Sequence, residues 1–116
     1  AVNDLTAQSC AAFQTACPDS PQVFYQSVGS KLQRARGGKF PLNLSYHFVR
    51  HFDGPNDGLV SSQSAVWGSS YRFVTTNARR GVSHADMVDL NRENIPDFDV
   101  REFYIKLVAE LKKQGF

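Results

Sequence analysis

Apolar and polar positions along the chain predict helices and strands in turn. The clearest helix covers residues 100–111, where apolar side chains recur every three or four positions and form one stripe. Asp99 is expected to be its N-cap, and Glu102, three residues on, completes the pattern of a capping box. Further helices are expected from residue 3 or 4 to 16, from 41 to 52, from 61 or 62 to 67, and around 86–90. In the first of these, the candidate buried positions are Leu5, Cys10, Ala12, Phe13 and Ala16.

Two segments predict β-strands. Residues 23–28 and 71–76 are rich in β-branched and aromatic residues, and Gly29 is expected to end the first strand. Alternation of helices and strands favours an α/β fold with a parallel sheet and crossover helices. Two parallel strands alone cannot be covered on both faces or hide their edges. The remaining strands are therefore expected on a missing N-terminal part or on a partner chain.

Composition is that of one soluble globular domain. The chain has 116 residues, of which 41% are hydrophobic and 21% charged, which argues against disorder or a fibrous protein. The net charge of +2 is too small to indicate nucleic acid as a partner. No apolar run approaches the roughly 20 residues that a transmembrane helix needs, so no membrane span is predicted.

The two cysteines leave the cellular compartment open. Cys10 and Cys17 are seven residues apart in a predicted helix, which would separate their Cα atoms by about 10.5 Å, beyond the reach of a disulfide. They can bridge only if the helix breaks between them, which Pro18 makes plausible. Without a bridge, both are expected to be small buried hydrophobic residues.

An acid and a histidine occupy positions that suggest catalysis. Asp57 lies in a tight turn between Asn56 and Gly58, and His84 lies in the loop after the second predicted strand. This order and placement match the acid and base of an α/β-hydrolase triad, which run Ser, Asp, His along the chain. The carboxylate would fix the imidazole tautomer, so that the other ring nitrogen could take a proton from a serine hydroxyl. The simpler alternative is a turn-stabilising Asp57 and a surface His84.

Three segments together resemble a known family. Residues 56–60, the pair Trp67 and Gly68, and residues 84–88 are similar to the C-terminal portion of lipase-like serine hydrolases of the α/β-hydrolase fold, particularly bacterial triacylglycerol lipases. The resemblance covers about residues 4–111. It implies a mostly parallel sheet with flanking helices, in which residues 1–116 form the C-terminal segment of a single domain, incomplete on its own. It also implies Asp57 as triad acid, His84 as general base, and a secreted location.

The chain departs from this family in lacking the nucleophile. The expected Gly-x-Ser-x-Gly motif is absent, and in its nearest counterpart, residues 81–85, Ala85 replaces the last glycine. Ser83 directly precedes the proposed base and is not expected to bond with it. The chain would therefore act as a carboxylic-ester hydrolase on an ester or lipid only when an upstream segment or companion chain supplies the serine. The alternative is a non-catalytic α/β interaction module whose sheet edge recruits a partner.

Metal and phosphate sites are weaker predictions, and no cofactor is predicted. Some members of the resembled family bind calcium through an aspartate two residues after the histidine, which makes Asp86 a weak candidate, but a structural role is favoured for it. His47 and His51 share a predicted helix face without a third ligand. The basic segment 31–39 is expected to be a solvated loop.

Overall fold

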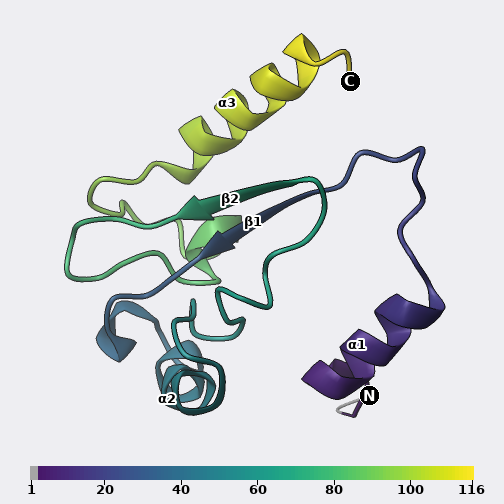
Figure 1. The fold of residues 1–116 in the computed structure, drawn as a ribbon. Coiled ribbons are helices and arrows are strands. Elements are labelled where there is room, and N and C mark those ends of the chain that lie inside the picture. The colour runs from purple at the N-terminus through teal and green to yellow at the C-terminus, as the bar shows by residue number, and fades with distance from the viewer. Residues whose placement is uncertain (1–2) are drawn as a thin grey trace.

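The computed structural model describes residues 3–116, which form three α-helices and one pair of strands. The helices are α1 (Ala7–Ala16), α2 (Leu42–Asp53) and α3 (Val100–Lys113), and the strands are β1 (Gln26–Ser30) and β2 (Ser70–Val74). Three short 3-10 helices complete the order: η1 (Asn3–Leu5), η2 (Ala35–Gly37) and η3 (Asp86–Val88). In Figure 1 the strand pair lies between α3 and α2.

The two strands are parallel, as predicted. Gln26 lies opposite Ser70, and Ser30 lies opposite Val74. The predicted bounds were wrong for β1, which begins three residues later and continues through Gly29. Gly29 lies within the strand, and its missing side chain leaves room for the Tyr71 hydroxyl and ring of the neighbouring strand. The pair agrees with part of an α/β fold.

The α3 and α2 predictions were confirmed to within one or two residues at each end. Asp99 Oδ1 accepts the backbone N–H groups of Arg101 and Glu102, at 2.9 and 3.1 Å, and so caps α3. The predicted helix at 61–67 was wrong. Its one turn is broken because β1 holds the next residues: the Trp67 N–H donates to Ser27 Oγ at 2.9 Å.

Helix α1 differs from its prediction in its start and its burial. Its N-cap is Thr6, not residue 3 or 4, since the Thr6 hydroxyl accepts the N–H of Ser9. Figure 1 shows α1 standing apart from the sheet, and no residue of α1 is buried. Cys10 and Cys17 are free thiols and exposed, so both predicted states, bridged and buried, were wrong.

The buried apolar core is small and lies around the segments that follow the strands. Its members are Leu32, Tyr46, Val74, Val82, Ala85, Ile95 and Val100. Large apolar side chains remain exposed over much of the rest, among them Phe13, Phe40, Phe48, Phe52, Leu90 and Ile105. The Cα radius of gyration is 15.3 Å, against about 13 Å for a compact domain of this length. The described residues thus leave many large apolar side chains exposed around a small core.

Candidate active site

One short segment after β1 holds together the two loops that carry Asp57 and His84. The Leu32 N–H donates to the carbonyl of Asn56 at 2.8 Å. On the other side, the carbonyl of Lys31 accepts the Val82 N–H at 2.9 Å. Residues 31–33 therefore act as a common support, although the two loops lie far apart in sequence.

Glycine is required where the second loop meets this support. Gly81 has a φ of +76°, and a Cβ there would lie 2.5 Å from the backbone nitrogen of Gln33 and 2.6 Å from the carbonyl oxygen of Lys31. No other residue combines this backbone conformation with so close an approach. The chain can therefore run directly against residues 31–33 before it turns to His84.

The Asp57 turn is built on the buried side chain of Asn56. Its amide nitrogen donates to the carbonyls of Tyr46 in α2 and Gly54, at 3.3 and 3.0 Å. Its amide oxygen accepts the Gly58 N–H at 2.9 Å. Asn56 is fully buried, so these bonds are shielded from competing water. The turn is thereby fixed both to α2 and to the glycine that follows the helix.

The two oxygens of the Asp57 carboxylate have different partners, one in the turn and one on the histidine. Oδ1 accepts the backbone N–H groups of Leu59 and Val60, at 3.0 and 2.8 Å. Oδ2 lies 3.0 Å from Nδ1 of His84. The His84 backbone N–H also donates to the Asp57 carbonyl at 2.9 Å. The structure thus brings together the two residues that the sequence singled out, through two separate hydrogen bonds.

Exposure differs sharply between the two partners. The Asp57 side chain is 8% exposed, whereas that of His84 is 46% exposed. An ionised carboxylate can only accept, so the neutral imidazole that bonds to it donates from Nδ1 and keeps the Nε2 lone pair free. Such a pair can accept a proton from a hydroxyl placed at Nε2, and the buried carboxylate can stabilise the resulting imidazolium.

His84 lines two adjoining cavities. The first, of about 280 Å³, is also lined by Asp57, the end of β1 and Tyr104 of α3. The second, of about 220 Å³, is lined mainly by apolar side chains from residues 40–42 and 85–90. At the first cavity, the hydroxyl of Ser30 is buried and has no hydrogen-bond partner among the described residues. Sequence reasoning missed Ser30; its place at the end of a strand was the available signal.

Asp86 is buried in an ion pair. Its two oxygens accept from the Arg80 guanidinium, at 2.8 and 3.1 Å, and Oδ2 also accepts the Ser83 N–H at 2.8 Å. The positive guanidinium occupies the face of the carboxylate that a calcium ion would need. These contacts agree with the structural role favoured for Asp86, and the calcium site that the family resemblance suggested stays a prediction.

We expect calcium to leave the protein's thermal stability unchanged. A ligand that binds only the folded state raises the unfolding midpoint, and binding at Asp86 would require the guanidinium to leave. Thermal scans in about 5 mM calcium and in excess EDTA should give the same midpoint. A rise of more than about 5 °C in calcium that is lost in Asp86→Asn would contradict this.

The other metal candidates, His47 and His51, lie four residues apart on α2. His47 and His51 are exposed on α2, where their rings make edge contacts with Tyr46 and Phe52. Within residues 3–116, no group of three or more His, Cys, Asp or Glu side chains could hold a metal ion. Ser83, as expected, does not bond with the adjacent His84; its hydroxyl accepts the Asp86 N–H at 3.2 Å.

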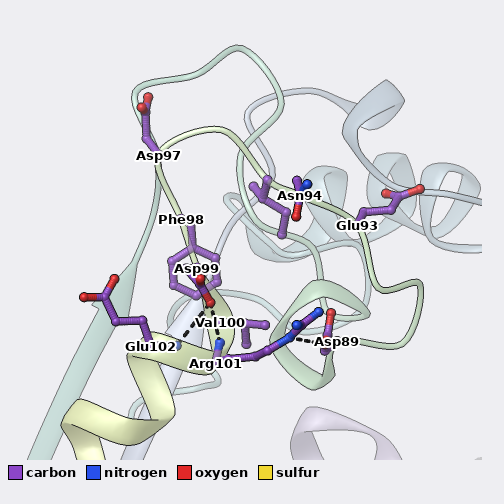
Figure 2. Close-up of a pocket in the computed structure, with 10 residues that line it drawn as sticks. Asp89, Glu93, Asn94, Asp97, Phe98, Asp99, Val100, Arg101 and Glu102 are labelled. Carbon is purple, nitrogen blue, oxygen red and sulfur yellow. Dashed lines mark hydrogen bonds and ion pairs between the residues drawn. The ribbon is translucent and has the colours of Figure 1, made fainter.

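A further cavity, of about 400 Å³, lies at the start of α3 and contains neither Asp57 nor His84. Figure 2 shows its acidic lining, with Asp99 capping the helix and Arg101 directed to Asp89. The Arg101 Nε to Asp89 Oδ2 distance is 3.0 Å. Asp99 therefore serves as a helix cap, and Asp89 forms an ion pair with Arg101.

One curated protein is similar to the chain. It is triacylglycerol lipase 2 of Saccharomyces cerevisiae, which is 26% identical over 117 aligned positions covering 90% of this chain. These positions make up 34% of the yeast protein, so the chain spans about a third of its relative. No family model and no solved structure matches. The similarity supports a lipase-like relationship, while the bacterial resemblance stays a prediction.

The lengths and hydropathy of the described helices can be compared with those of a transmembrane helix. None of those within residues 3–116 is both long and apolar enough to cross a bilayer.

Proposed function

We propose that this chain supplies the acid and base of a serine carboxylic-ester hydrolase of the lipase or esterase class. The observation that carries the proposal is the 3.0 Å contact between Asp57 Oδ2 and His84 Nδ1, made by a buried carboxylate and a half-exposed imidazole. The similarity to a yeast triacylglycerol lipase favours an ester of a fatty acid as substrate. The apolar cavity beside His84 could accommodate the fatty-acyl part of such an ester.

The reaction requires a serine from outside these residues. Its hydroxyl adds to the ester carbonyl as His84 Nε2 takes the proton, and Asp57 stabilises the charged ring. His84 then returns the proton to the leaving alcohol, and an acyl-enzyme remains. Water attacks the acyl-enzyme with His84 again as base, releasing the acid and the serine. Backbone N–H groups of the same absent segment would hold the oxyanion.

We propose that residues 1–116 are the C-terminal segment of one α/β-hydrolase domain, and we call the chain joined to its nucleophile segment the completed enzyme. The small core, the exposed apolar side chains and the two-stranded sheet support this. The same exposed surface would also serve a non-catalytic interaction module. The paired Asp57 and His84, together with the similarity to a yeast triacylglycerol lipase, favour the enzyme.

A fluorophosphonate probe tests the proposal, because it labels only a serine activated by its histidine. We expect stoichiometric labelling of the completed enzyme at a serine outside residues 1–116. Peptide mapping by mass spectrometry locates the adduct. His84→Gln should remove the label, and His51→Gln on the surface of α2 is the matched control that should keep it.

The outcome also separates the two functions. An adduct on Ser30 or Ser83 would place the nucleophile within this chain, contrary to the proposal. A protein that resists the probe and hydrolyses no ester would support the interaction module instead.

A further inference from the structure

The backbone on both sides of His84 is closed by a reciprocal pair of hydrogen bonds. The Ser83 N–H donates to Asp86 Oδ2 at 2.8 Å, and the Asp86 N–H donates to Ser83 Oγ at 3.2 Å. Both side chains are buried. His84 lies between the two residues, so its backbone can move only if one of these bonds breaks.

The carboxylate in this closure depends on Arg80. Two guanidinium nitrogens of Arg80 donate to the two oxygens of Asp86, at 2.8 and 3.1 Å. The Asp86 side chain is 2% exposed. Burying a carboxylate this deeply costs free energy unless a charged, hydrogen-bonded partner offsets the lost hydration. The planar guanidinium also fixes the orientation of the carboxylate, because it donates two parallel bonds.

Arg80 is itself held from two directions. Its carbonyl accepts the Gln33 N–H at 3.2 Å, which ties it to the support that also carries the Asp57 turn. Its Nη2 donates to Glu93 Oε2 at 2.8 Å as well as to Asp86. Glu93 in turn pairs with Lys39 in the loop before α2. The guanidinium is therefore positioned independently of the His84 loop.

From these contacts we propose that Arg80 is a positioning residue for His84, acting through Asp86 and Ser83; the proposal rests on the function proposed above. Without the guanidinium, the buried Asp86 carboxylate loses the partner that fixes its orientation and is expected to turn toward solvent. The Ser83 N–H then loses its acceptor, and the loop no longer holds the His84 ring 3.0 Å from Asp57. A misplacement of about 1 Å lowers a reaction rate by about 10²-fold.

The first test compares two substitutions at Arg80 in the completed enzyme. Arg80→Gln should lower kcat for a soluble p-nitrophenyl ester about 10²-fold with KM nearly unchanged. Arg80→Lys keeps the charge but loses the two-pronged contact, and should restore kcat to within about 10-fold of the original. Arg79→Gln removes the same charge from the exposed neighbour and is the control that should retain full kcat.

The second measurement reads the histidine directly. In ¹⁵N-histidine-labelled enzyme, the NMR shifts of the neutral His84 ring report the share of molecules with the proton on Nδ1. We expect this share to fall in Arg80→Gln and to recover in Arg80→Lys, at temperatures well below each unfolding midpoint. A purely structural arginine would lower the midpoint and leave both kcat and this share unchanged, which would overturn the proposal.

Two further outcomes are decided in advance. If Arg80→Gln does not fold, Arg80→Lys decides alone: a several-fold lower kcat supports the proposal, and an unchanged kcat overturns it. If His84→Ala retains activity, the proposed function fails, but the tautomer measurement still tests whether Arg80 positions the ring. Failure of one proposal is thus distinguishable from failure of the other.

Discussion

His84→Ala in the completed enzyme is expected to lower kcat for ester hydrolysis by about 10⁶-fold. Loss of the histidine of a triad costs about this much, because serine then has no base and the leaving alcohol has no acid. KM should change little, since the ring takes part mainly in the transition state. Steady-state assays with a soluble chromogenic ester measure both constants.

The matched control is His47→Ala. His47 is an exposed histidine on α2, and removing it should leave kcat unchanged. A His84→Ala variant within about 10-fold of the original rate would exclude His84 as the general base. Since the His84 side chain is nearly half exposed, its removal should scarcely alter the unfolding midpoint, so a lost rate cannot be attributed to unfolding.

Asp57→Asn is expected to lower kcat by about 10⁴-fold while the fold is retained. The asparagine oxygen can still accept the N–H groups of Leu59 and Val60, which keeps the turn. The amide nitrogen then faces His84 and donates to Nδ1. The ring must take the opposite tautomer, with its proton on Nε2, where it cannot accept from serine.

Asp53→Asn makes the same chemical change at an exposed position near the end of α2 and should be silent. Circular dichroism melts should give both variants a midpoint within about 5 °C of the original. Equal kcat values for the two variants would show that Asp57 serves the turn alone, which is the simpler alternative that the sequence left open.

Elements with strong local signals could be predicted from sequence. Helix α3 has both an apolar stripe and Asp99 as cap, and its bounds followed from these. The parallel pairing of β1 and β2 followed from helix–strand alternation. The predicted helix at 61–67 failed because β1 recruits that backbone through Ser27, a contact 40 residues away in sequence. The burial expected for α1 failed for a similar reason: whether a helix face is buried depends on which segments pack against it, and local periodicity does not predict that.

The candidate site divides in the same way. Asp57 and His84 were predicted because each lies in a turn with recognisable neighbours. The supporting arginine was not, because Arg80 is one of several basic residues in a polar loop and nothing local marks it. Its role becomes visible only when the buried carboxylate of Asp86 is seen to face it. Ser30 was also missed, because Gly29 was expected to end the strand before it.

The excursion through α2 leaves the support at residue 33 and returns at Asn56, directly beside Leu32. The two ends of this segment meet at residues 31–33. The inner face of α2, which is directed toward the Asp57 turn, must keep its hydrogen bonds, whereas the side chains on the opposite, outer face take no part in them. Tyr46 on the inner side receives the Asn56 bond, whereas Leu44, Phe48 and Phe52 are exposed in the described structure. Substitutions on the outer face of α2 can therefore change which surface this face binds, while the geometry of Asp57 and His84 is retained.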